Sequence, residues 1–289
     1  KPSANWTTNT DSMCLGAGSF NFTQTNPSAG QTNSWNYGDT RTSTIQNPTG
    51  ISYSAPGNYT VNLTTVIGGL CSTSVAKVVK VFGVPQALFS VNDSTQCEDM
   101  NSFVFTNNSF LNSATGVQYT WTLNPPGASY LVKDIAPINL PNVGKYNLNL
   151  NVISDKGCET DFMNSLELYP SPKVTITGQN QCKGVPVVFT ENVVLSSGTI
   201  ANYNWNFGDA RTGNTIPATH TYTNDGSYNA SLQVTSDKGC VATSNTVINI
   251  IYPLPTASFT GTYLLSRGAE SDYQFVSTST GVTTLRWTY

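Results

Sequence analysis

Six cysteines are the residues whose type and spacing could most readily do chemistry in this chain of 289 residues. They stand at positions 14, 71, 97, 158, 182 and 240, and six cysteines allow 15 pairings. No two have Cys-x-x-Cys spacing and the sequence holds one histidine, which disfavours a zinc site. We expect disulfides, and hence an oxidising compartment: secreted, periplasmic or cell-surface. Free buried thiols in a cytosolic protein are the alternative.

Groups that could catalyse a reaction are sparse. Catalysis by a nucleophile and histidine needs a histidine, and His220 is the one in the sequence. Glycoside hydrolysis needs two placed carboxylates, whereas the acidic residues here are few and stand mostly in turn sequences. The sequence contains no phosphate loop, metal-ligand cluster or cofactor motif. We therefore expect a protein that is not an enzyme, with no catalytic residue and no cofactor.

Composition disfavours two further classes of protein. Charged residues make up 10% of the chain, against about 25% in typical domains. A net charge of −3 and a pI near 5.0 argue against a nucleic-acid partner. No apolar run approaches the ~20 residues of a membrane span. Residues 1–5 are polar, unlike a signal peptide, so we expect a mature or internal piece if the protein is exported.

Short alternating runs dominate the sequence and predict an all-β fold. Tyr203, Trp205 and Phe207 alternate with asparagine, which is the period of a half-buried strand. Gly208-Asp209 ends this run, where glycine permits positive φ and the carboxylate can accept N–H bonds within the turn. Gly38-Asp39 repeats the arrangement. Arg41 and Arg211, each two residues after the aspartate, could pair with it.

The same pattern recurs about every 84 residues. Between the two cysteines of each repeat lies one tryptophan, predicted to be in the core, and a tyrosine that precedes the second cysteine by twelve residues. The tryptophans are Trp35, Trp121 and Trp205, and the tyrosines are Tyr59, Tyr146 and Tyr228. Because each repeat owns one pair of cysteines, we predict the disulfides Cys14–Cys71, Cys97–Cys158 and Cys182–Cys240. In the chain-entropy model, closing a loop of nearly 60 residues contributes roughly 4 kcal/mol.

The repeats define the domains that we predict. Sandwiches are expected over 1–84, 85–169 and 170–254, the second divergent because Asn124-Pro125-Pro126-Gly127 replaces Gly-Asp. The junctions carry proline and no flexible linker, so we expect the units to stack end to end as a rod. Residues 255–289 form an incomplete fourth unit, with its aromatic strand at 285–289 and Arg267 where the first cysteine would stand. We expect its missing strands to come from sequence beyond Tyr289, or from another chain.

The third repeat resembles the PKD repeat, an immunoglobulin-like β-sandwich. The resemblance rests on the Trp-x-Phe-Gly-Asp strand end, on a His-x-Tyr and on a Gly-x-Tyr strand, namely Trp205, Phe207, Gly208, Asp209, His220, Tyr222, Gly226, Tyr228, Leu232 and Val234. It implies that His220 is structural and that the three corner tyrosines bond a nearby backbone group. It also raises calcium binding at Asp39 and Asp209, although a turn-capping aspartate is the simpler interpretation.

Tandem PKD-like units rich in Asn, Ser and Thr, with an Asp-Lys-Gly-Cys turn, resemble the surface adhesins of gliding Bacteroidetes, the SprB-type family exported by type IX secretion. The resemblance implies a non-catalytic stalk segment of a cell-surface adhesin, outside the cell and associated with the outer membrane. The expected partners are surface polysaccharide, other cell-surface proteins and the secretion and motility machinery. The alternatives are a PKD-like spacer or polysaccharide-binding region of a secreted hydrolase, and a lectin-like module using aromatics such as Tyr130 or Phe162.

Overall fold

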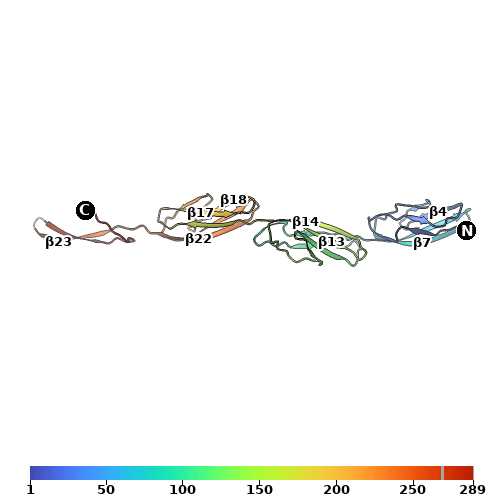
Figure 1. Cartoon of the computed structure of the whole chain (residues 1–289), viewed down its shortest axis with the longest axis horizontal. Helices are drawn as coiled ribbons and strands as arrows, with labels where there is room; N and C mark the ends of the chain where they lie inside the picture. The colour runs from blue at the N-terminus through green and yellow to red at the C-terminus, as the bar shows by residue number, and fades with distance from the viewer. Residues whose placement is uncertain (268–269, 289) are drawn as a thin grey trace. The chain divides into compact units, whose positions relative to one another are not determined.

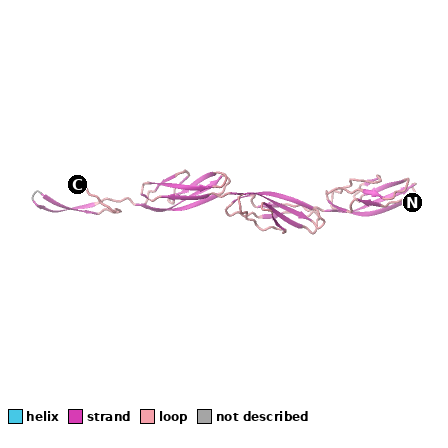
Figure 2. Ribbon diagram, viewed as in Figure 1, coloured by secondary structure: helices cyan, strands magenta, loops and turns pink. Residues whose placement is uncertain are grey.

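The computed structural model describes residues 1–267 and 270–288 of the chain, and within them the secondary structure consists of strands, turns and loops (Figure 2). By their contacts they form two compact units. The first comprises Lys1–Gln96 and Met100–Leu168, and the second comprises Cys97–Asp99 and Tyr169–Tyr289. Each unit is described separately below. The all-β fold predicted from the alternating pattern is confirmed.

The first unit begins with a sandwich of two sheets, in which neighbouring strands are mostly antiparallel (blue in Figure 1). The larger sheet has the order β2 (Ser12–Cys14), β7 (Cys71–Phe82), β6 (Gly57–Ile67), β4 (Gln31–Asn36) and β5 (Thr42–Ser43). The smaller pairs β1 (Trp6–Thr8) with β3 (Phe22–Gln24). One exception to the antiparallel pairing is β2, which runs parallel to the last residues of β7. This places Cys14 opposite Phe82, at the end of the repeat.

The same unit contains a second sandwich (green in Figure 1). Its larger sheet has the order β12 (Ala128–Tyr130), β11 (Gln118–Asn124), β13 (Gly144–Ile153), β14 (Glu159–Tyr169) and β9 (Thr95–Cys97). The smaller pairs β8 (Phe89–Val91) with β10 (Phe105–Asn107).

The second unit repeats this architecture. Its larger sheet has the order β16 (Gln181–Cys182), β22 (Val241–Tyr252), β21 (Gly226–Ser236), β18 (Ile200–Asn206) and β19 (Thr212–Gly213). The smaller has the order β15 (Lys173–Gly178), β17 (Pro186–Val194) and β20 (Ala218–Thr221). A hairpin of β23 (Phe259–Arg267) and β24 (Glu270–Ser277) follows. The predicted boundaries between sandwiches, and their end-to-end stacking, stay predictions.

The tryptophan between the two cysteines of each of the first three repeats lies in the core, as predicted. Trp35, Trp121 and Trp205 are all 0% exposed. Each stands opposite a leucine of the neighbouring long strand, in the pairs Trp35–Leu63, Trp121–Leu150 and Trp205–Leu232. Alternation turns these side chains to the same face of the sheet, where they meet the phenylalanines of the smaller sheet.

The fourth repeat lacks such a core in the described residues. Phe259, Phe275 and Trp287 contact one another, yet they are 58%, 54% and 49% exposed. Residues 285–288 are not a strand, which corrects the prediction of an aromatic strand there, and Tyr289 lies outside the described residues. In the other repeats this strand is followed by a long strand that starts at the Gly-x-Tyr motif and pairs with it. Residues 255–289 have a Gly-x-Tyr at Gly261–Tyr263, but it lies inside β23, before residues 285–288, and no such strand follows them in this sequence.

The tyrosine corners form as predicted. The hydroxyls of Tyr59, Tyr146 and Tyr228 each donate to a carbonyl four residues earlier, at 2.8, 2.7 and 3.1 Å. In two repeats the ring of the corner tyrosine also stacks on a tyrosine that precedes it in the chain. In the third repeat this is Tyr222 of the His-x-Tyr motif, whose ring centroid lies 4.1 Å from that of Tyr228. The corner therefore fixes the start of the long central strand against the loop before it.

Replacing Tyr228 with phenylalanine should remove this hydrogen bond and leave the ring stacking in place. We expect the third sandwich to lose about 1 kcal/mol of unfolding free energy, the usual net value of one hydrogen bond. Hydrogen exchange of the amides in β21 would measure the loss. The same change at Tyr146 should act on β13 instead, and unchanged exchange in both variants would contradict the structural role of the hydroxyl.

Candidate functional site

Side chains that could react or bind a ligand are found at three places: the Gly-Asp turns, a hollow lined by amides, and the cysteines. In the first repeat, the Asp39 carboxylate accepts the backbone N–H of Arg41 at 3.3 Å and its guanidinium Nε at 2.8 Å. The guanidinium also donates to the carbonyl of Ser52. The predicted Asp–Arg pair is thus present here, and it ties the turn to the next loop.

The third repeat uses a histidine for the same purpose. His220 Nε2 lies 2.8 Å from Asp209 Oδ2, and the imidazole ring stacks on Phe207 with centroids 4.2 Å apart. His220 is 8% exposed. Asp209 also accepts the backbone N–H of Arg211 at 3.2 Å. These contacts confirm the structural role of His220.

Both aspartates are held in their ionised form. Burial opposes ionisation of Asp209, but hydrogen bonds from His220 and from the Arg211 backbone outweigh it and lower the pKa of the carboxyl. Burial likewise opposes ionisation of Asp39, and Arg41 lowers its pKa. The aspartates therefore act as charged anchors of their turns.

Calcium prefers six to eight oxygen ligands, usually including several carboxylates. Within the described residues no three His, Cys, Asp or Glu side chains are grouped as a metal site. The Asp39 and Asp209 carboxylates are instead engaged by neighbours in the same repeat. The geometry thus gives no support to a calcium site at these turns.

The lowered pKa of Asp209 predicts a pH dependence of the third sandwich. Because the folded pKa lies below the ordinary value of 3.8, the unfolded state binds more protons between the two values. The contribution to stability is therefore complete above about pH 4 and is lost as the pH falls through the folded pKa. Hydrogen exchange of β21 between pH 2.5 and 5 should show this loss in the native protein, and a smaller one in Asp209→Asn. Parallel pH profiles for the two proteins would refute it.

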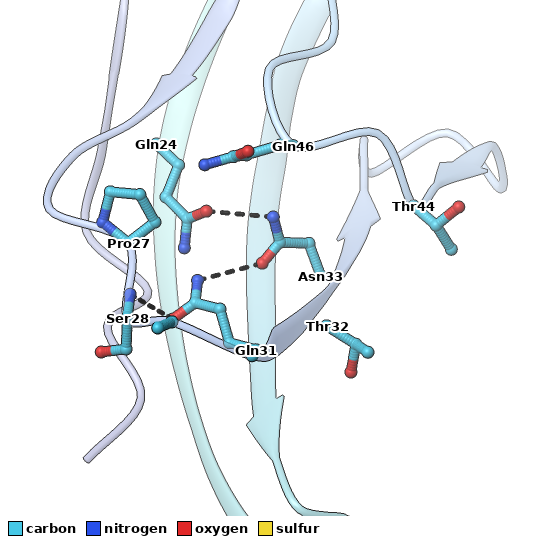
Figure 3. Close-up of a pocket in the computed structure, with 10 residues that line it drawn as sticks. Gln24, Pro27, Ser28, Gln31, Thr32, Asn33, Thr44 and Gln46 are labelled. Carbon is cyan, nitrogen blue, oxygen red and sulfur yellow. Dashed lines mark hydrogen bonds between the residues drawn. The ribbon is translucent and has the colours of Figure 1, made fainter.

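A shallow hollow in the first sandwich is lined by amide side chains (Figure 3). Asn33 donates to Gln24 Oε1 at 3.0 Å, and Gln31 donates to Asn33 Oδ1 at 3.2 Å. Gln31 in turn accepts the backbone N–H of Ser28 at 2.9 Å. These amides largely satisfy one another, and no aromatic ring lines the hollow on which a sugar could stack. The amide side chains of the hollow therefore form a polar network that connects neighbouring strands.

The aromatics suggested for a lectin-like surface are engaged in the second core. Tyr130 and Phe162 are partly buried and pack against that core. Phe162 also meets Phe89 edge to face, with centroids 5.2 Å apart. This packing gives no support to a lectin surface built on the two rings.

The cysteines pair differently from the prediction. The disulfides are Cys14–Cys158 and Cys97–Cys240, each with Cα atoms 5.6 Å apart, while Cys71 and Cys182 are free and exposed. The predicted pairs Cys14–Cys71, Cys97–Cys158 and Cys182–Cys240 are wrong. In each observed bond, the first cysteine of one repeat meets the second cysteine of the next.

Strand geometry explains the error. Cys14 lies opposite Phe82, at the end of β7, whereas Cys71 is the first residue of that strand. At ~3.3 Å per residue the twelve residues of β7 separate the two by roughly 35 Å. A disulfide needs Cα atoms within about 7 Å. The two cysteines of one repeat thus stand at opposite ends of its sandwich.

Comparison with known proteins places these sandwiches in a family. A microbial collagenase of Vibrio alginolyticus is 34% identical over 82 residues, 28% of this chain and 10% of the collagenase. The pre-pro-metalloprotease PrtV of Vibrio cholerae serotype O1 is 34% identical over 104 residues, 33% of this chain and 11% of PrtV. The solved PKD1 domain of the Vibrio cholerae protease is 30% identical, with a TM-score of 0.26, and the match covers 28% of this chain and 98% of the domain.

The chain spans about a tenth of the length of the curated relatives that it matches. Those relatives therefore resemble it over single domains. The family model for the PKD domain matches residues 1–81 and 169–250, the first and third repeats, which together make up more than half of the chain. The chain belongs to the PKD domain family.

Proposed function

We propose that this chain is a non-catalytic repeat segment that holds other parts of a large secreted protein apart. The observation that carries the proposal is the repeated pairing of one repeat with the next through disulfides. Such bonds link successive repeats covalently, which suits a spacer. The disulfides also favour an oxidising, extracellular location.

The specific role that we propose is the stalk of a cell-surface adhesin of the gliding-motility type, exported by type IX secretion and associated with the outer membrane. Its partners would be surface polysaccharide or other cell-surface proteins, together with the secretion and motility machinery, and it would need no cofactor. The uncharged polar surface, rich in Asn, Ser and Thr, supports a protein that displays its repeats outside the cell. Among the described residues, no helix is long and apolar enough to cross a membrane.

The similarity to proteases supports a second candidate function, a spacer within a hydrolase. The collagenase and the metalloprotease are named as proteases, and each matches this chain over a short stretch of its length. The chain would then be a spacer between the catalytic and binding parts of a secreted hydrolase. The sequence of the full gene product separates the two: many further repeats support the adhesin stalk, and a catalytic domain in the same polypeptide supports the hydrolase spacer.

A spacer should keep its units extended in solution. A compact globule of this length would have a radius of gyration of about 19 Å. Sandwiches stacked end to end, with strands of ~17–20 Å plus loops, should give roughly twice that value. Small-angle scattering of the oxidised chain would measure it. A radius near 20 Å would refute the stacked arrangement for either candidate.

A further inference from the structure

The two free cysteines occupy the same positions as cysteines that are bonded elsewhere in the chain. Cys182 ends β16 and stands opposite Tyr252, as Cys14 stands opposite Phe82. The residue after each cysteine donates its N–H to the carbonyl of that aromatic residue, at 2.9 Å in both repeats. Cys97 has the same arrangement, since Glu98 donates to Tyr169 at 2.8 Å. The first cysteine of every repeat therefore lies where its repeat ends.

Cys71 has equivalents of its own. Cys158 and Cys240 each stand four residues after the serine that starts the turn between the two long strands, and Cys71 stands four residues after Ile67. In all three turns the residue before the cysteine donates to the carbonyl at the start of the turn. Cys71 thus holds the same place in its turn as the two bonded cysteines, although Gly68 and Gly69 give that turn two positive φ angles where the other turns have one.

The free cysteines are more exposed than the bonded ones, as expected if the repeat that carries their disulfide partner is missing. Cys158 and Cys240, which are bonded, are 1% and 0% exposed. Cys71 and Cys182 are both exposed. Since the position in the repeat is the same, we attribute the difference to whether a neighbouring repeat covers the sulfur.

We propose that Cys71 and Cys182 are two further positions of one disulfide ladder, which continues into repeats that flank this chain. Cys182 bonds a cysteine in the turn between the long strands of the fourth repeat. The existing bonds span 144 and 143 residues, so that partner is about 143–144 residues after Cys182 in the same polypeptide. Cys71 bonds the first cysteine of a preceding repeat, at the same separation.

The ladder also has a stopping point. Arg267 stands in the sequence where the fourth repeat would carry its first cysteine. The fourth repeat can therefore accept the bond from Cys182 but offers none to a fifth repeat. A fifth repeat, if it keeps a turn cysteine, should carry that cysteine as a free thiol.

Each new bond needs an oxidant. Two thiols lose two protons and two electrons as the S–S bond forms, and a dithiol–disulfide oxidoreductase of the oxidising compartment accepts the electrons by exchange, its own disulfide becoming a dithiol. The exposure of both sulfurs allows the mixed disulfide that this exchange requires.

The test is alkylation before reduction, followed by non-reducing peptide mapping, on the protein from its natural source. We expect neither Cys71 nor Cys182 to be alkylated, and the Cys182 peptide to be linked to one about 143–144 residues later. The chain of 289 residues made alone is the matched control. Both of these cysteines should be alkylated there, and the other four should not.

Any other state of Cys182 in the natural protein overturns the ladder: a free thiol, a mixed disulfide with a small thiol, or a bond to Cys71 of another copy. The proposal rests on the proposed function insofar as it needs flanking repeats. A gene product without such repeats defeats the ladder and the adhesin stalk, and leaves the hydrolase spacer as the function. Flanking repeats combined with free thiols defeat the ladder and leave the spacer role intact.

Discussion

Replacing Trp35 with alanine is expected to destabilise the first sandwich by about 3–5 kcal/mol, the usual cost of truncating a buried aromatic to alanine. The side chain is 0% exposed and packs against Trp6 and Phe22, with ring centroids 5.6 Å away in both cases. Its indole N–H also donates to the carbonyl of Ile45 at 2.9 Å. A cavity would open where the two sheets meet.

Hydrogen exchange suits this measurement because the repeats need not unfold together. The amides of β6 should lose protection, whereas those of β21 in the second unit should keep it. Trp287→Ala is the matched control, since that tryptophan is 49% exposed and its loss should cost less than about 1 kcal/mol. Similar losses for the two variants would contradict the assignment of Trp35 to the core.

Replacing Gly208 with valine is the second change with a large expected effect. Gly208 has φ +82°, and a Cβ there would lie 2.7 Å from the Asn229 carbonyl oxygen. Forcing a β-branched residue into the left-handed region costs about 1–2 kcal/mol, and displacing the backbone of a central strand adds about 1–3 kcal/mol. We expect the third sandwich to lose about 2–5 kcal/mol, measured by exchange in β21.

Gly184 supplies the control for this experiment. It lies in the same repeat with φ +78°, yet a Cβ there would meet nothing within 4 Å. Gly184→Val should therefore carry the backbone cost alone. Equal losses at the two positions would show that the close approach to Asn229 contributes nothing.

Much of the fold could be predicted because the signals are local. Alternation around Trp205 specifies a strand and the face that it buries, and the Gly-x-Tyr spacing specifies the corner. Gly-Asp reads as a turn because glycine tolerates positive φ, and Gly208 has φ +82°. The contact between Asp209 and His220 is harder to predict from the His-x-Tyr motif, because it depends on how the loop before β20 folds back.

The disulfides could not be predicted from these signals. Each repeat holds one pair of cysteines, which suggests a bond within the repeat. The short parallel pairing of β2 with the end of β7 moves Cys14 far from Cys71. Such pairing leaves little trace in the sequence, since Ser12–Cys14 is a strand of three residues without alternation. The nearly equal separations of 144 and 143 residues follow from the period of the repeat, which a pairing within each repeat would share.

The crossed bonds change how the chain would carry tension. Pulled from its two ends, an unbonded polypeptide passes force through every residue, and the 144-residue separation between Cys14 and Cys158 could lengthen to roughly 500 Å. With both bonds in place, the shortest covalent route crosses from Cys14 to Cys158, runs backwards along the second repeat to Cys97 and crosses again to Cys240. Most of the first and third repeats therefore lie off this route. If the first or third sandwich unfolded under load, the chain would therefore lengthen little, and the unfolded repeat would stay tethered to the rest of the chain and could refold.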